Sequence, residues 1–390
     1  MLESIYIGMT GLLGYSKGLR VIANNTANMN TPGFKRSELQ FSDMFYSNGG
    51  SQSSGQMGYG LNTQGTLLSF RQGEQRQTGN DLDAAIDGQG LFILKGESGA
   101  LTYSRAGQFQ IGKDGTIVNQ GTGETLMGYD SDGNLTAFDL TGRSTNPAKA
   151  TSLIKFGGNL SSTATDQTVN GIKVIDALGG EHTLSAKFTN TNATTAGSWA
   201  VELFDGTTSV GTGQIIFDNG TPQATTNKVT LTYSPAGVAP IPLTLDFSAD
   251  VTSNASGTLS TLAMTTQDGY GPGGLTKVTF DNTGYLVLTY SNAQTVKGNR
   301  LALARFDSAD AVESVGDNQF KATDGRLWHV GVADSGNFGK VRAGMVEISN
   351  VDLSQEFSNL VVMQRGYQAS SQIISTANDM LQELFSMKGK

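Results

Sequence analysis

The 390 residues include 26 basic and 34 acidic side chains, 15% of the chain against roughly 25% in an average soluble protein. The net charge of −8 leaves no basic stripe, which argues against a nucleic-acid partner. The chain has no cysteine and only two histidines, so disulfides, thiolate metal sites and histidine-based triads are poor candidates. The length allows two or three domains.

The first 30 residues carry a helical pattern. Apolar side chains follow a spacing of three and four that is typical of a helix seam facing another helix, with Leu2, Ile5, Met9, Leu12 and Leu19 along it. Four glycines interrupt this segment, and each costs up to ~1 kcal/mol relative to alanine inside a helix. We therefore expect a helix that forms only when it docks on other chains, where small residues allow close approach.

A turn ends this helix near Asn28. Thr31-Pro32-Gly33-Phe34 places proline and glycine at the two central positions of a type II turn. The Ser/Gly/Gln-rich residues 47–60 indicate a flexible or irregular segment, and residues 31–69 as a whole are predicted to be a connector.

From about Leu61 to Ser349 the pattern is all-β, with short β-type runs separated by Asp-Gly and Asn-Gly turns. Residues 146–277 are rich in Thr, Asn, Ala and Ser, which predicts a separate outer β-domain. This outer domain is inserted into an inner β-domain that consists of residues 70–145 and 278–351. The two chain ends are then expected to meet at one end of the inner domain.

A second helical pattern ends the chain. Asp352, with Gln355 three residues later, is a start signal for a helix. The seam of this helix consists of Leu360, Met363, Tyr367, Ile374, Leu381 and Leu384. Residues 1–30 and 352–390 are therefore predicted to pair as a coiled-coil-like stem, and the fold class is mainly β with α-helical termini.

No motif indicates catalysis. Asp81, Asp83 and Asp87 lie close in sequence, but the apolar residues between them fit an ordinary packing role. Asp130-Ser-Asp132-Gly-Asn134 imitates the start of a calcium loop but lacks the later glycine and glutamate, so we interpret it as a turn. We expect no enzyme activity, no metal site and no cofactor.

Two blocks at opposite ends of the chain resemble the signatures of the bacterial flagellar axial proteins, the family that builds rod and hook. The first contains Asn24, Asn25, Asn28, Thr31, Gly33 and Phe34, and the second contains Asn350, Val351, Asp352 and Leu353. Core segments such as Thr78–Ile86 and Tyr103–Phe109 are similar to motifs that rod and hook share. Val174–Gly179 resembles part of the outer domain of hook subunits, and Asp268–Gly273 resembles the segment that returns into the inner domain.

This resemblance implies a structural subunit that self-assembles into the flagellar hook, a flexible curved tube that acts as a universal joint and transmits torque from rod to filament. The alternative is a distal rod subunit, which the 132-residue insert disfavours. The implied partners are other copies of the chain, the distal rod, the hook cap, the hook-filament junction proteins and the flagellar export apparatus. The implied location is extracellular, after type III export without a cleaved signal peptide, and no transmembrane segment is visible.

A β-rich adhesin or a polysaccharide-active enzyme is a different reading of the same composition. Either would need an aromatic binding face or a convincing carboxylate pair, and neither stands out in the sequence.

Overall fold

The computed structural model describes residues 2–44, 46–48, 56–308 and 311–388. The chain divides into two compact units. Unit 1 consists of residues up to Thr141, Lys277–Leu288 and Val296 onward, and unit 2 consists of Gly142–Thr276 and Thr289–Thr295. Unit 2 is thus inserted into unit 1 along the chain.

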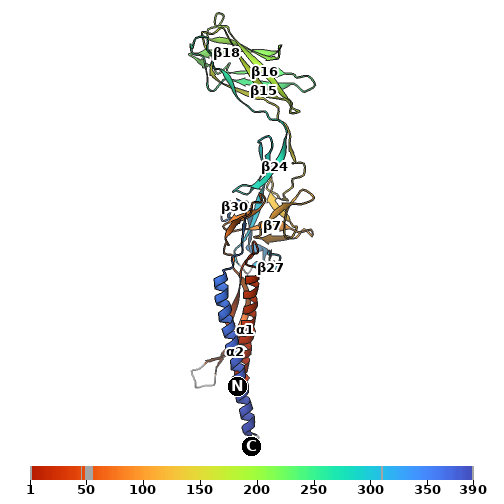
Figure 1. Cartoon of the computed structure of the whole chain (residues 1–390), viewed down its shortest axis with the longest axis vertical. Helices are drawn as coiled ribbons and strands as arrows, with labels where there is room; N and C mark the ends of the chain where they lie inside the picture. The colour runs from red at the N-terminus through yellow and green to blue at the C-terminus, as the bar shows by residue number, and fades with distance from the viewer. Residues whose placement is uncertain (1, 45, 49–55, 309–310, 389–390) are drawn as a thin grey trace. The chain divides into compact units, whose positions relative to one another are not determined.

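Two long helices at the chain ends pack side by side in unit 1 (Figure 1). They are α1 (Leu2–Ala27) and α2 (Leu353–Lys388). Asp352 caps α2, because its Oδ1 accepts hydrogen bonds from Ser354 N at 2.8 Å and from Gln355 N at 3.2 Å. No described helix is long and apolar enough to cross a membrane.

The α1 face that meets α2 is a glycine stripe. Gly8, Gly11 and Gly18 are buried, and a Cβ added to them would lie 2.5–2.9 Å from side-chain atoms of Ile374, Ser370 and Met363, respectively. The absence of side chains on α1 lets the two backbones approach closely. The α2 side chains fill the space that the glycines leave.

A β-hairpin leaves α1 and runs back along it. Strand β1 (Ser37–Asp43) pairs antiparallel with β4 (Leu61–Leu68), with a bulge between Gln40 and Phe41. Strand β2 (Tyr46–Asn48) pairs with β3 (Gln56–Gly58) further along. The hairpin is held to α1 by Lys17 Nζ, which donates to Thr63 Oγ1 at 2.9 Å.

Most of the remaining structure of unit 1 belongs to one large sheet, whose main path includes β24-β25-β26-β11-β7-β8-β28-β27. The first four residues of β24, the last two of β25 and the first of β26 group with unit 2. Strands β10 and β12 pair with β11, β9 pairs with β10, and β29 pairs with β26. Phe92 and Phe109 are fully buried and meet edge to face with ring centres 5.1 Å apart. Two small sheets, β5–β31 and β6–β30, carry the chain toward the helices.

The strands of this region are β5 (Gln75–Gln77), β6 (Ala84–Asp87), β7 (Leu91–Lys95), β8 (Leu101–Ser104), β9 (Phe109–Ile111), β10 (Ile117–Asn119), β11 (Thr125–Tyr129), β12 (Leu135–Ala137), β24 (Gly273–Phe280), β25 (Tyr285–Tyr290), β26 (Thr295–Phe306), β27 (Val312–Gly316), β28 (Gln319–Ala322), β29 (Trp328–Val332), β30 (Lys340–Ala343) and β31 (Met345–Glu347). A 3₁₀ turn, η2, spans Gly325–Leu327.

Unit 2 contains two five-stranded sheets around one apolar core. One sheet has the order β15-β16-β17-β18-β19 and the other has the order β20-β21-β14-β22, with β23 on β14. The core contains Trp199, Phe156, Phe188 and Phe247, each no more than 2% exposed. Alternating burial along β16 and β20 is the pattern of strands with one face on a core.

The strands of unit 2 are β13 (Thr145–Asn146), β14 (Leu153–Asn159), β15 (Asp166–Ile175), β16 (Glu181–Asn190), β17 (Ser198–Asp205), β18 (Thr208–Asp218), β19 (Thr221–Pro222), β20 (Lys228–Tyr233), β21 (Ile241–Asp246), β22 (Val251–Thr252) and β23 (Ala263–Gln267).

The predicted fold class, mainly β with paired terminal helices, is confirmed. Residues 47–60, which the composition predicts to be flexible or irregular, contain strand residues at 47–48 and 56–58; residues 49–55 lie outside the described residues. The predicted connector, residues 31–69, also carries strands at 37–43 and 61–68, and pairing between β1 and β4 supplies order that the Ser/Gly-rich composition does not indicate. Residues 289–295, which the composition places in the inner domain, group with unit 2.

Asp268 anchors the start of β14 in unit 2. Its carboxylate accepts hydrogen bonds from Ser152 N and Leu153 N at 2.8 Å, and from Ser152 Oγ at 2.7 Å, and it pairs with Lys149 Nζ at 3.0 Å. Burial alone would raise the pKa of Asp268, but these hydrogen bonds outweigh burial and hold its pKa well below the usual range.

Replacing Asp268 with asparagine should lower the free energy of unfolding of unit 2 by about 1–3 kcal/mol at pH 7, because charged hydrogen bonds are lost. A depressed carboxyl pKa stabilises above the unfolded pKa of about 4, and this stabilisation is lost as the pH falls toward the folded pKa. The difference between parent and variant should therefore shrink on acidification. Urea unfolding measures it through Trp199, in a Trp328→Phe background.

The matched control is Asp218→Asn, at an exposed position on β18. An equal loss in this variant, or a difference that stays constant down to pH 2, would contradict the assignment.

Candidate functional site

Residues of the two terminal blocks meet where the helices join the large sheet of unit 1. We call this part of unit 1 the neck and define it as residues 25–37, 69–74 and 347–356. Asn25, buried at the end of α1, exchanges two hydrogen bonds with Ser37: Nδ2 donates to Ser37 O at 2.8 Å, and Oδ1 accepts from Ser37 N at 3.0 Å. Its Nδ2 also lies 3.2 Å from Glu356 Oε1 on α2.

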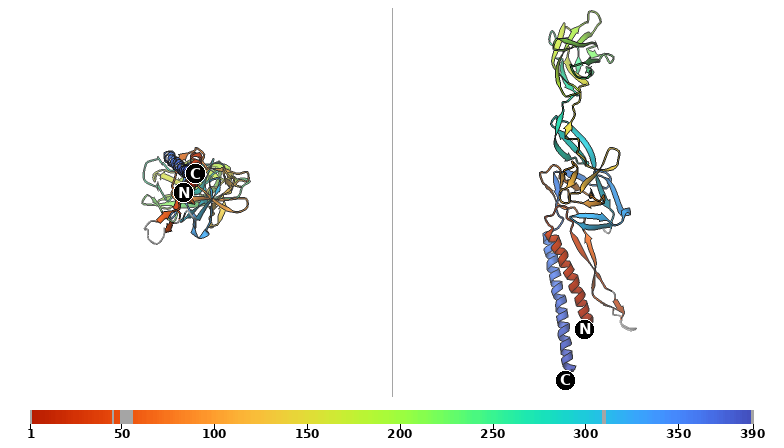
Figure 2. Two further views of the ribbon diagram at one scale, coloured as in Figure 1. Left: turned by 90° about the horizontal axis from the view of Figure 1, so that it is seen from below. Right: turned by 90° about the vertical axis from the view of Figure 1, so that its right-hand side faces the viewer.

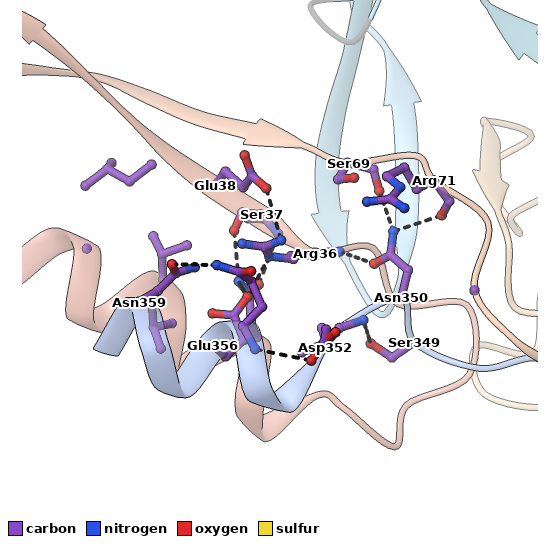
Figure 3. Close-up of a pocket in the computed structure, with 18 of the residues that line it drawn as sticks. Arg36, Ser37, Glu38, Ser69, Arg71, Ser349, Asn350, Asp352, Glu356 and Asn359 are labelled. Carbon is purple, nitrogen blue, oxygen red and sulfur yellow. Dashed lines mark hydrogen bonds and ion pairs between the residues drawn. The ribbon is translucent and has the colours of Figure 1, made fainter. Parts of the chain in front are cut away.

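Asn350 performs the same task for the other chain end (Figure 3). Its Oδ1 accepts from Arg36 N at 2.8 Å, and its Nδ2 donates to Ser69 O and Arg71 O, each at 2.8 Å. The side-chain amide of Asn350 therefore links its own segment to the backbone at Arg36 and at Ser69 and Arg71, which are far away in the sequence. These hydrogen bonds give partners to backbone N–H and C=O groups that lie outside the regular helices and strands.

A buried carboxylate lies at the centre of the neck. Glu347 Oε1 is 2.6 Å from Lys35 Nζ, and Glu347 Oε2 is 2.5 Å from Arg105 Nε. The three side chains are 0%, 2% and 5% exposed, respectively. Glu347 Oε1 also accepts from Gly73 N at 2.8 Å.

Both cations also donate to backbone carbonyls. Lys35 Nζ donates to Arg71 O at 3.0 Å. The guanidinium of Arg105 donates to the carbonyls of Ile86 and Gly88 at 2.7 Å and to that of Gly90. The triad thus joins the N-terminal block, the inner sheet and the segment before α2.

The electrostatics follow from this geometry. Burial would raise the pKa of Glu347, but the charges of Arg105 and Lys35 outweigh burial and lower it below its usual value. Burial lowers the pKa of Lys35, and the attraction of Glu347 only partly offsets this. Glu347 thus lies between Lys35 and Arg105, whose charges favour its ionised form.

Gly33 turns the chain from α1 toward the sheet. Its φ of 73° fits the third position of the predicted type II turn, and Phe34 N donates to Thr31 O at 3.3 Å. Gly33 N donates to Glu347 O at 2.8 Å, and a Cβ at this position would lie 2.7 Å from Ala106 Cα. Only glycine fits both the conformation and the space.

An open groove of about 900 Å³ lies against the neck, and residues of α1, α2 and β1 line it together with the neck. Arg36 spans it, with ion pairs of 2.6 Å to Glu356 and 3.1 Å to Glu38. Within the described ranges no group of three or more His, Cys, Asp or Glu side chains could hold a metal ion. The arrangement fastens segments together.

The remaining signature residues contribute mostly local contacts. Asn28 Nδ2 donates to Asn24 O at 2.9 Å, and Thr31 Oγ1 lies 3.2 Å from Asn28 Oδ1. Phe34 and Val351 are half-buried, and Leu353 at the start of α2 is exposed.

The predicted seam residues do not all lie between the two helices. On α1, Leu2 and Met9 are exposed and Ile5, Leu12 and Leu19 are half-buried, because the glycine stripe faces α2 instead. On α2, Met363 and Ile374 meet this stripe, Leu360 and Leu381 are half-buried, and Tyr367 and Leu384 are exposed. A role of these residues in self-assembly stays a prediction.

The three aspartates weighed for catalysis have separate structural partners. Asp81 pairs with Lys277 at 2.8 Å, Asp87 pairs with Arg342 at 2.9 Å, and buried Asp83 accepts from Asn80 Nδ2 at 2.9 Å.

The remaining motifs are also structural. Asp130 forms the expected turn, with Oδ1 accepting from Asp132 N and Asn134 N. His182 and His329 belong to different units and pair with Asp176 and Asp307.

Sequence reasoning missed Lys35, Arg36, Arg105, Glu347 and Glu356. The available signal was that these charged residues lie inside or beside the signature blocks of a chain with few charges. No local rule indicates that residues separated by 242 and 312 positions share one buried ion-pair triad.

Comparison with known proteins identifies the family. Three family models match: "Flagella basal body rod protein" over residues 5–35, "Flagellar hook protein FlgE/F/G D1 domain" over 85–154, and "Flagellar basal body rod FlgEFG protein C-terminal" over 342–387. The flagellar hook protein FlgE of Escherichia coli K12 is 31% identical over 97% of this chain and 98% of its own length. The chain belongs to the flagellar hook protein family.

Other hook proteins match over the full length as well. FlgE of Rhizobium meliloti is 30% identical over 98% of each chain. The crystal structure of the Helicobacter pylori flagellar hook protein FlgE2 has the same fold, with a TM-score of 0.55 at 12% identity over 70% of this chain and 100% of that one. These full-length matches support a hook subunit over a distal rod subunit.

In this hook-family chain, the Glu347→Gln variant should lower the free energy of unfolding of unit 1 by about 3–5 kcal/mol, because Lys35 and Arg105 lose their buried counter-charge. Unfolding followed by Trp328 fluorescence in a Trp199→Phe background measures the change. In the parent chain, the pKa of Glu347 is lower in the folded state than in the unfolded state. The ionised carboxylate therefore contributes its full stabilisation to folding above the unfolded pKa, and this stabilisation declines as the pH falls below that value.

The matched control is Asp81→Asn, which removes the exposed pair with Lys277 and should cost no more than about 1 kcal/mol. Equal effects of the two variants would refute a special role for the buried triad.

Gly33→Ala should destabilise unit 1 by more than Gly99→Ala. Both glycines have positive φ, 73° and 84°, so both variants bear the cost of about 1–2 kcal/mol for a left-handed residue. An added Cβ meets backbone only at position 33, and nothing lies within 4 Å at position 99. Denaturant midpoints of the two variants test this, and an equal shift would count against a steric constraint in the neck.

Proposed function

We propose that this chain is a structural subunit that self-assembles into the flagellar hook, a curved flexible tube that transmits torque from rod to filament. The observation that carries the proposal is the apolar surface of the terminal helices. Leu13 on α1 and Val362, Met380 and Met387 on α2 are each more than 50% exposed in the single chain. Such surface is typical of an interface with other molecules.

The neck supports a mechanical role. Torque that passes between the terminal helices and the β-structure must cross residues 25–37 and 347–356, since these are the only two covalent connections. The hydrogen bonds of Asn25 and Asn350 and the buried Glu347 triad brace both connections. A joint held at many points turns as one body.

We propose that the tube bends at contacts between copies that lie outside the helices. Charged residues make up only 15% of the chain, and an exposed ion pair is worth no more than about 1 kcal/mol, so charge contacts between copies would not fix one register between neighbours. The family also suggests the distal rod, hook cap, hook-filament junction proteins and export apparatus as partners. We also propose an extracellular location, which the chain reaches by export without a cleaved signal peptide.

Purified full-length chain should form curved hollow tubes when sulfate salts strengthen apolar burial, as seen by electron microscopy. A chain that lacks residues 2–27 and 353–388 should remain unassembled under the same conditions while circular dichroism reports retained β-structure. Tubes formed equally well by the trimmed chain would contradict a helix-driven assembly. Straight rods from the full chain would favour the rod alternative.

A further inference from the structure

Helix α2 carries two apolar stripes. The first, Met363, Ile374 and Leu381, lies on the side of the glycine stripe of α1. The second consists of Val362, Ile373, Met380 and Met387, all exposed, and its last three members are seven residues apart. Because Val362, Ile373 and Met380 each directly precede a member of the first stripe, the second stripe is rotated by about 100° around the helix. Such a helix offers coiled-coil seams to two different helices.

Helix α1 also has a second face. Leu2, Tyr6, Met9 and Leu13 follow a spacing of four, three and four, and all four are exposed. At 3.6 residues per turn this face points about 180° away from Gly8, Gly11 and Gly18. It therefore lies on the side of α1 that is turned away from α2.

The register of the hairpin leaves part of α2 without a partner. Gly8 lies against Ile374 and Gly18 against Met363, so the helices are antiparallel. Six residues before Gly8 is Leu2 and six residues after Ile374 is Met380, so α2 continues past the level at which α1 begins. Figure 2 shows α2 extending beyond the start of α1. No residue of α1 can cover Leu384, Phe385 or Met387, which are all exposed.

We propose that the second stripe of α2 docks on the outer face of α1 in a second copy of this chain. The inference rests on the proposed hook function and specifies which helix faces meet. The α1 face from Leu2 to Leu13 spans about three turns, and the part of the stripe from Ile373 to Met387 spans about four, so the end of α2 is long enough to cover the whole α1 face. The contact continues the interface already present in each chain, because each α1 then lies between its own α2 and that of a neighbour.

This pairing explains why assembly is open-ended. The two faces are different surfaces of one molecule, so the contact is heterologous, and each added copy leaves one α1 face and one α2 stripe free. Pairing of like faces would instead close the assembly at two copies. Growth of a tube requires the heterologous contact.

The test uses the absence of cysteine from the chain, which makes introduced thiols unique. Leu13→Cys marks the α1 face and Met380→Cys marks the α2 stripe, and both native side chains are exposed, so the fold should tolerate the changes. Within one chain Leu13 is level with about residue 369, roughly 16 Å along the axis from Met380. A bismaleimide cross-linker shorter than this distance reports only links between copies.

Tubes of the double variant should give a ladder of cross-linked multimers on denaturing gels. Either single variant alone should give no dimer, and an equimolar mixture of the two single variants should give dimers only. The matched control Leu13→Cys/Gln372→Cys places the second thiol beside Ile373 on an exposed position outside the stripe and should give no ladder.

Dimers from the Leu13→Cys variant alone would overturn the proposal, because like faces would then meet. An equal ladder from the Gln372 control would do the same. If the parent chain forms no tubes, the proposed function fails; if tubes form but the double variant does not cross-link, only this inference fails.

Discussion

The buried carboxylate of Glu347 is the contact on which the rest of unit 1 depends. It joins Lys35, just after the turn that ends α1, to Arg105, directly after strand β8, and it stands three residues before Asn350. Removing two cations and an anion from water is costly, and the triad persists because its lone pairs and protons have partners. These three segments are far apart in sequence, so the triad forms only when the whole of unit 1 is folded. The same contact thereby fixes both chain ends to the sheet.

The neck fixes the chain ends to the sheet, and the terminal helices provide the proposed contacts between copies. Inside the chain, α1 gives its glycine stripe to α2, which brings the backbones close but leaves the larger apolar side chains of α1 outside. The glycines that weaken α1 as an isolated helix are therefore also the reason that its leucine and methionine side chains remain available to other copies. The proposed assembly depends on this arrangement, in which the α1 face against α2 carries glycine and the opposite face carries the large apolar side chains.

Local chemistry made much of the fold predictable. The turn at Gly33 and the cap at Asp352 depend on residues within three positions of each other, and both are present. The β1–β4 hairpin was not predicted, because its stability comes from pairing across some 25 residues and from packing on α1 rather than from the Ser/Gly-rich sequence between its strands. The helix interface was misplaced for a related reason: hydrophobic periodicity locates large side chains, whereas the two backbones approach where α1 has none.

Tubes assembled from the full chain can be reconstructed at a resolution that shows side chains. We expect the α1 face of Leu2, Met9 and Leu13 to be buried against α2 of a neighbouring copy, while the contacts of Glu347 with Lys35 and Arg105 stay as they are in the single chain. Terminal helices whose outer faces remain in solvent, or a neck in which Glu347 has exchanged its partners, would contradict this expectation.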